Sequence, residues 1–76
     1  MFSDFIEYDP LILAGKPVLK GTRIGVEQVL EHLASGWSQK DILDNYPRLS
    51  SQHINASLAY ATYLVHQERF FPLKAV

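Results

Sequence analysis

Residues 38–65 read SQKDILDNYPRLSSQHINASLAYATYLV, and this stretch decides the predicted fold. Its apolar residues recur with the period of an α-helix, and a proline interrupts that pattern near the middle. The pattern predicts a short helix over about 38–46 and a long helix over about 51–69. Two helices joined by a turn of a few residues form a helix-turn-helix unit.

The ends of both predicted helices carry residues that commonly begin or end a helix. Ser38 and Asp41 have the spacing of a capping box, in which each residue satisfies a backbone N–H of the other. Pro47 prevents the first helix from running much further, and Ser50 is an N-cap candidate for the second. The first helix would bury a stripe formed by Ile42, Leu43 and Tyr46.

The long helix is apolar on more than one face. One predicted buried stripe consists of Ile54, Leu58, Ala61 and Val65. Beside it lie residues with large side chains: Tyr60, Tyr63, Leu64, Phe70 and Phe71. Either the N-terminal hairpin covers this second face, or a partner protein does. We favour a partner interface, because aromatic residues are enriched in the cores of such interfaces.

The chain before residue 38 predicts a third helix and a hairpin. The helix spans about 26–35, with Gly36 at its C′ position and a buried face of Val26, Val29, Leu30, Leu33 and Trp37. In residues 5–24, prolines and glycines recur too often for a helix. We expect a small hairpin there, with short edge strands at Phe5–Tyr8 and Val18–Leu19.

The chain has 76 residues and no cysteine. A single domain over 1–76 buries only about 60% of its unfolded surface, so its core is small. Disulfides and thiolate metal sites are excluded, which leaves a partner chain as the expected support. We therefore expect a homodimer. No apolar run approaches the roughly 20 residues of a membrane span, and we recognise no signal peptide, so the predicted location is the cytoplasm.

The long helix would be the recognition helix of a DNA-binding unit, with its first residues facing base edges. The exposed positions there are Ser51, Gln52 and Asn55, with His53 nearby, and Gln or Asn amides can pair with adenine. Arg48 precedes the helix and would hold a phosphate. The other bases that could complete a local footprint are Lys40, or a group of Lys16, Lys20 and Arg23.

The chain is close to electrically neutral, with a net charge of −1. Residues 26–47 carry four acids and one base, whereas residues 48–76 carry three bases and one acid. A DNA footprint must therefore be local, and a dimer would double the number of phosphates contacted. The alternative is a module of the same fold that binds only protein, which the acidic first two helices favour.

The sequence predicts no enzyme active site. His32, His53 and His66 lack the spacing of metal ligands, and the pattern of a phosphate-binding loop is absent. The Gly-Thr-Arg sequence at 21–23 suggests a functional turn, in which the glycine allows a tight turn and the threonine accepts a local backbone hydrogen bond. No nucleophile is paired with a base. We expect neither enzymatic activity nor a cofactor or metal.

Several motifs occur in order along the chain: Asp9-Pro10, Gly15-Lys16-Pro17-Val18, Lys20-Gly21-Thr22-Arg23-Ile24, Val29-Leu30 with Leu33-Ala34-x-Gly36, Ile42-Leu43-x-x-Tyr46-Pro47-x-Leu49, and Ile54-x-Ala56-x-Leu58-Ala59-Tyr60-Ala61. Together they resemble the bacterial family called domain of unknown function 433, over roughly residues 5–63. The chain departs from that family at Ala14, often glycine there, at Gly25, usually proline, and at Ser57, commonly alanine. It also has Gln52 and Asn55 where the family has a charged pair.

The resemblance implies a mainly α fold, a homeodomain-like or winged helix-turn-helix with a short N-terminal β-hairpin. It also implies a link to VapB-type antitoxins, which are encoded beside a PIN-like nuclease toxin. Such an antitoxin would neutralise the nuclease and, as a complex, repress its own promoter. The expected partners are thus a second copy of the chain, a PIN-like nuclease and double-stranded DNA, with no membrane involved.

Overall fold

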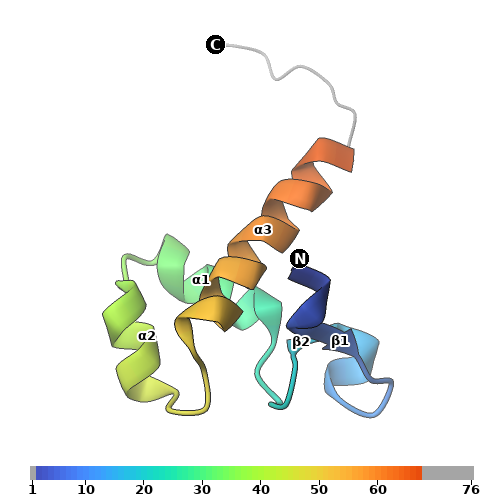
Figure 1. Ribbon diagram of the computed structural model, residues 1–76, viewed down its shortest axis with the longest axis horizontal. Helices are drawn as coiled ribbons and strands as arrows, with labels where there is room; N and C mark the ends of the chain where they lie inside the picture. The colour runs from blue at the N-terminus through green and yellow to red at the C-terminus, as the bar shows by residue number, and fades with distance from the viewer. Residues whose placement is uncertain (1, 68–76) are drawn as a thin grey trace.

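The computed structural model describes residues 2–67 and places three helices after an N-terminal hairpin (Figure 1). The predicted mainly α fold with a short hairpin is confirmed. The end of the predicted long helix, residues 68 and 69, lies outside the described residues. The elements follow in the order η1 (Phe2–Asp4), β1 (Ile6–Tyr8), η2 (Leu13–Gly15), β2 (Pro17–Leu19), α1 (Val26–Ala34), α2 (Gln39–Asn45) and α3 (Ser51–Gln67).

The hairpin pairs β1 and β2 as antiparallel strands. Ile6 lies opposite Leu19, and both side chains are buried in the core. The connection between the strands contains η2, a 3-10 turn that the pattern of prolines and glycines did not predict. Within it, Leu13 and Ala14 have positive φ angles of 51° and 55°, a region in which glycine is usual.

The helix ends use the residues that the sequence indicated. Ser38 donates its backbone N–H to Asp41 Oδ2 at 2.8 Å, and Ser38 Oγ accepts from the Asp41 N–H at 3.1 Å. The predicted capping box is therefore confirmed. Gly36 follows the end of α1 with a φ of +98°. Its N–H donates to the Leu33 carbonyl and the Trp37 N–H donates to the His32 carbonyl, which is the Schellman pattern.

The core lies between the hairpin, α1, α2 and the first half of α3. Each element contributes at least one side chain without solvent exposure: Leu19 from β2, Val29 from α1, Ile42 from α2 and Ile54 from α3. Ser57 is also fully buried, and its hydroxyl donates to the His53 carbonyl at 3.0 Å. A serine therefore replaces the family's common alanine here without leaving a polar atom unsatisfied.

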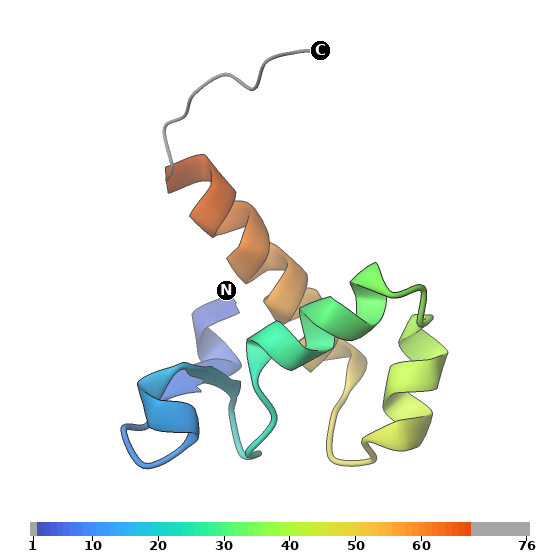
Figure 2. The ribbon, with the colours of Figure 1, turned by 180° about the vertical axis from the view of Figure 1, so that it is seen from behind.

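The predicted buried stripe of α3 is correct only in part. Ile54 is fully buried, but Leu58 is 44% exposed and Val65 is 74% exposed. Both views show the second half of α3 standing clear of α1 and the hairpin (Figure 1, Figure 2). The helical period correctly aligned these residues along one face, but the elements that cover the first half of α3 do not reach the second.

The N-terminal segment covers the opposite side of α3. The Phe2 ring lies 5.5 Å from the Tyr60 ring, edge to face, and 5.6 Å from the Tyr63 ring. The Tyr60 and Tyr8 hydroxyls are 3.1 Å apart. Tyr60 is therefore partly packed within the domain, whereas Tyr63 and Leu64 stay about half exposed, and the contact of these residues with a partner stays a prediction. Phe70 and Phe71 lie outside the described residues.

Candidate nucleic-acid interface

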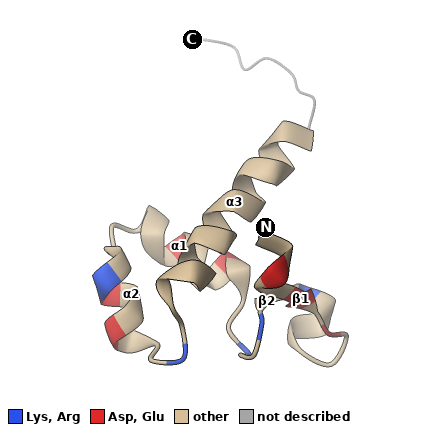
Figure 3. Ribbon diagram, in the orientation of Figure 1, with Lys and Arg blue, Asp and Glu red and all other residues tan. Residues whose placement is uncertain are grey.

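Two loops carry basic residues to the same edge of the molecule. Figure 3 shows them as blue segments in the connection between α2 and α3 and in the loop between β2 and α1. Arg48 belongs to the first loop, and its Nη1 atom donates to the carbonyl oxygen of Gly21 in the second at 3.5 Å. Lys20 and Arg23 flank that glycine. Arg48 and Arg23, which the sequence placed in separate groups, are thus brought together.

The loop at 20–25 holds its shape through hydrogen bonds within and beyond itself. Gly21 has a φ of +82°, which a residue with a side chain rarely adopts. The buried Thr22 hydroxyl donates to the Leu19 carbonyl at 2.7 Å and accepts from the Ile24 N–H at 3.0 Å. The Gly21 N–H donates to Glu7 Oε2 at 3.3 Å. The predicted Gly-Thr-Arg turn is confirmed, and the contact with Glu7 is a long-range one that no local pattern indicated.

His53 ties this loop to the first turn of α3. The Ser50 N–H donates to His53 Nδ1 at 3.0 Å, and the His53 N–H donates to Ser50 Oγ at 3.3 Å. This reciprocal pair confirms Ser50 as the N-cap and gives His53 the place that Glu or Gln takes in a capping box. Because Nδ1 accepts a hydrogen bond, the ring proton is on Nε2, which donates to the Lys20 carbonyl at 3.1 Å.

A concavity of about 600 Å³ lies between the two loops. Its lining residues are Glu7, Ile12, Gly21, Thr22, Arg23, Ile24 and Arg48. Two guanidinium groups on one concave surface favour an anionic group with several acceptor oxygens, such as a phosphate. The Glu7 carboxylate also lines the concavity, and its hydrogen bond to the Gly21 N–H holds it against the turn.

The polar residues predicted to read base edges are also exposed, and two of them line a different concavity. Ser51, Gln52 and Asn55 lie in the first turns of α3 and are open to solvent. Gln52 and Asn55 line a second concavity, of about 280 Å³, beside the rings of Phe2 and Phe5. That groove runs between η1 and α3, and its lining does not include Arg23 or Arg48.

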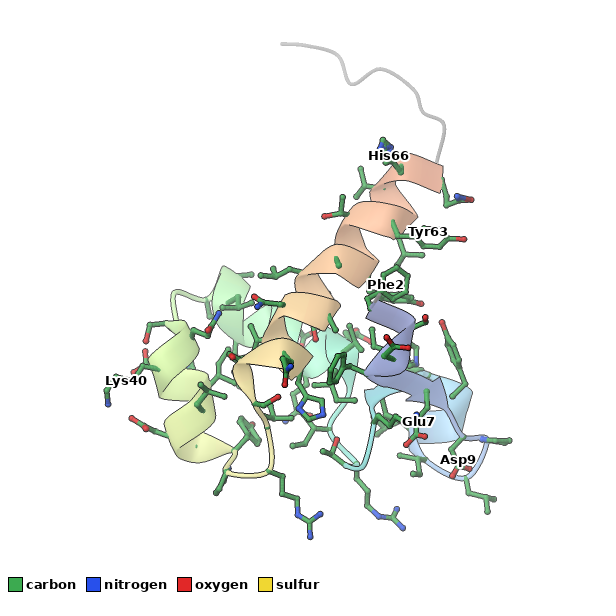
Figure 4. The ribbon with its side chains drawn as sticks, viewed as in Figure 1. Phe2, Glu7, Asp9, Lys40, Tyr63 and His66 are labelled. Atoms are coloured by element: carbon green, nitrogen blue, oxygen red, sulfur yellow. The ribbon has the colours of Figure 1, made fainter. Side chains whose placement is uncertain are left out.

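Two predicted bases are not brought to the Arg23 and Arg48 edge. Lys40 lies in the first turn of α2 and points outward, whereas Arg48 follows the other end of that helix (Figure 4). The Lys40 ammonium pairs with Asp44 at 2.9 Å. Lys16 pairs with Glu27 at 3.4 Å, next to α1. Neither lysine therefore lines the concavity that Arg23 and Arg48 share, and contact of Lys40 or Lys16 with DNA stays a prediction.

Among residues 2–67, no group of three or more His, Asp or Glu side chains could hold a metal ion. His32 instead stacks on Trp37, with 4.0 Å between ring centroids, and its Nε2 lies 2.9 Å from the Tyr46 hydroxyl. His53 is engaged at the start of α3. Within the same residues, no helix has the length and apolar character needed to cross a membrane.

Comparisons with known proteins agree with this architecture. The family model described as "Protein of unknown function (DUF433)" matches residues 6–61. The chain is 34% identical over 58 residues to "Uncharacterized protein y4eO" of Sinorhizobium fredii (strain NBRC 101917 / NGR234). This match covers 76% of the chain but 26% of the relative, so the chain spans about a quarter of that protein's length.

The fold is also similar to the crystal structure of a DUF433 member protein from Anabaena variabilis ATCC 29413. The TM-score is 0.77 and the sequences are 27% identical. The similarity covers 88% of this chain and 66% of that one.

Proposed function

The chain belongs to the DUF433 family of proteins of unknown function, and from its basic edge we propose that it is an antitoxin-like DNA-binding protein of the cytoplasm, with no enzymatic activity. One observation carries the proposal: Arg23 and Arg48, from two loops far apart in the sequence, line one concavity beside the start of α3. An edge of this kind supports contact with the phosphate backbone of a duplex.

The charge distribution supports the same orientation on DNA. The acidic residues Glu27 and Glu31 lie on α1, and Asp41 and Asp44 lie on α2. These helices would face away from the polyanion, because their carboxylates repel phosphates whereas the two arginines attract them. His53 would hold that edge in a fixed position relative to α3 through the Lys20 carbonyl.

Sequence preference would come from the first turns of α3. Ser51, Gln52 and Asn55 are exposed there, and their side chains can donate and accept hydrogen bonds at base edges. The two arginines would set the position on the backbone, and these three residues would supply the base contacts. The complex would repress the promoter of its own gene.

The partner in this proposal is a PIN-like nuclease encoded beside the gene, which the protein would neutralise. The family resemblance motivates this part. The exposed side chains of Tyr63 and Leu64 on α3 are available for such a contact. Co-expression with the neighbouring gene product, followed by purification of one tagged protein, tests it: failure to recover a complex would contradict the nuclease part and leave the DNA part standing.

Binding to DNA from upstream of the gene tests the central claim. Fluorescence anisotropy should show affinity that falls with salt, and Arg23→Ala or Arg48→Ala should each lower the slope of log affinity against log salt by about 1. Lys40→Gln is the matched control, because Lys40 is a base at the far end of α2, paired with Asp44. An absence of salt-sensitive binding, with and without the neighbouring gene product, would exclude the DNA function.

A module that binds only protein is the second candidate, and one observation favours it. Gln52 and Asn55 lie along the groove that Phe2 and Phe5 line, so the predicted base-reading side chains border an apolar surface. A groove with apolar walls and two amides also suits a peptide segment. Asn55→Ala separates the candidates: it should weaken DNA binding in the first case and only protein binding in the second.

A further inference from the structure

The second half of α3 carries an apolar stripe that the rest of the described chain leaves uncovered. Leu58 is 44% exposed and Val65 is 74% exposed. Ala61 and Thr62 lie between them on the same side of the helix, since residues three, four and seven apart share a face. The stripe continues the line of Ile54, which is fully buried against the core.

The helix that carries this stripe has no charged side chain. From Ser51 to Gln67 there is no Asp, Glu, Lys or Arg, and α3 is tan along its whole length in Figure 3. An exposed face of a helix normally carries charged residues. A strongly charged partner would find no complementary charge on this face. The surface that covers it is therefore expected to be uncharged and apolar, as the stripe itself is.

We propose that the stripe is covered by the same stripe of a second copy of this chain, with the two α3 helices antiparallel. The spacing is self-complementary. Leu58 and Val65 lie two helical turns apart, about 10 Å along the axis, with the small Ala61 and Thr62 midway. If two copies cross at those small residues, Leu58 of each packs against Val65 of the other.

The polar atom in the stripe does not oppose burial. Thr62 Oγ1 donates to the Leu58 carbonyl at 3.0 Å within the helix, so its hydroxyl proton is already satisfied. The Thr62 methyl group is then available for packing, and covering the residue leaves no unpaired donor. Two copies with a net charge of −1 each also repel one another weakly.

A twofold pairing of this kind is self-consistent, because each copy offers and receives the same surface. The stripe lies on the half of α3 away from the loops that carry Arg23 and Arg48 (Figure 1). Pairing through α3 thus leaves those loops free and does not depend on whether they bind DNA.

Sedimentation of the full chain at micromolar to millimolar concentration tests the pairing. The wild type should show a mass that rises with concentration to that of a dimer, and Val65→Lys should stay monomeric over the same range. Leu11→Lys is the matched control, since Leu11 is 89% exposed, apolar and outside α3. Circular dichroism confirms that each variant is folded. A wild type that is monomeric throughout, or an equal effect of both variants, would overturn the proposal and leave the stripe to a different protein.

Cysteine cross-linking tests the antiparallel direction, because the chain has no cysteine of its own. Thr62→Cys lies next to the proposed crossing and should form an intermolecular disulfide under mild oxidation. Val65→Cys should not, since residue 65 lies on the stripe but its two copies would be about 10 Å apart along the axis, and a disulfide needs Cα atoms within about 7 Å. Efficient cross-linking through Val65→Cys, which adjacent parallel helices would give, would contradict the antiparallel arrangement.

Discussion

The Nε2 atom of His53, in the first turn of α3, lies 3.1 Å from the carbonyl oxygen of Lys20, in the loop after β2. The same ring accepts the Ser50 N–H at Nδ1, and the ring of Phe5 packs edge to face against it at 5.8 Å. One imidazole therefore satisfies the start of a helix and a loop carbonyl 33 residues away. The loop that carries Arg23 is positioned relative to α3 by this contact.

Replacing His53 with alanine should loosen both connections. His53→Ala removes the acceptor for the Ser50 N–H and the donor for the Lys20 carbonyl, with an expected loss of about 1–2 kcal/mol in the free energy of unfolding. Urea denaturation measures it. His66→Ala, at an exposed position in the last turn of α3, should change stability by less than about 0.5 kcal/mol. Equal losses in the two variants would show that the two hydrogen bonds of His53 do not contribute.

The capping box at the start of α2 predicts that the stability of the protein decreases in acid. The hydrogen bond from the Ser38 N–H to the Asp41 carboxylate, and then the hydrogen bond with the Ser38 side chain, lower the pKa of Asp41 from its ordinary value of 3.8. The charged carboxylate is thus favoured in the folded chain. Its contribution to stability is present above the ordinary pKa and is lost as pH falls through the lowered one.

Ser38→Ala removes one of the two hydrogen bonds and should raise the Asp41 pKa part of the way back, as NMR titration of the carboxyl group would show. The loss of the cap should also destabilise the protein by about 1 kcal/mol at neutral pH. Ser35→Ala, an exposed serine after α1, is the control and should leave both quantities unchanged. An Asp41 pKa that does not respond to Ser38→Ala would remove the physical basis of this prediction.

Replacing Ala14 with glycine should stabilise the folded protein. Its φ of 55° and ψ of 35° are left-handed, which costs a residue with a Cβ roughly 1–2 kcal/mol. Ala14→Gly relieves that cost but adds flexibility to the unfolded chain, so we expect a net gain of up to about 1 kcal/mol in thermal or urea unfolding. Ala59→Gly, in the middle of α3, should instead lose about 1 kcal/mol. Destabilisation by Ala14→Gly would contradict the left-handed conformation.

The raised pKa of Tyr60 predicts that the stability of the protein depends on pH in the alkaline range. The hydrogen bond with Tyr8, together with burial, raises the pKa of Tyr60 to about 12 from 10.0. The folded chain therefore holds this phenol proton more tightly than the unfolded chain does. That contribution to stability is complete below pH 10 and is lost as the pH rises towards 12. Tyr8→Phe should lower the Tyr60 pKa, and ultraviolet titration of the phenols measures the change. A titration curve of Tyr8→Phe in which Tyr60 titrates as it does in the wild type would refute the role of the Tyr8 hydrogen bond.

Local signals accounted for the ends of the helices. Ser38, Gly36 and Ser50 act within a few residues of their own position, so their effect on α1, α2 and α3 is nearly independent of the rest of the chain. The turn at η2 was not predicted, because Leu13 and Ala14 are residue types that rarely take a positive φ. The Gly15 N–H donates to the Ile12 carbonyl and the Lys16 N–H donates to the Leu13 carbonyl, and these two hydrogen bonds close the turn that contains them.

The sequence predicted individual residues of the candidate site but not how they are arranged relative to one another. Arg48 and Arg23 were both expected to contact DNA, but their meeting at one concavity depends on how the loop after β2 packs against the α2–α3 turn. Lys40 was expected to form a local basic footprint with Arg48. They lie at opposite ends of α2, and a nearby carboxylate, Asp44, already pairs with Lys40.

The sequence by itself determined where three helices and two short strands form, since period, caps and turn residues act over a few positions. Only the tertiary structure decided which side of each helix is covered, because that depends on how far the neighbouring elements extend. Leu58 and Val65 share the face of Ile54, yet α1 and the hairpin end before they reach them. Tyr60, on another face, is covered because Phe2 reaches back over it from the start of the chain.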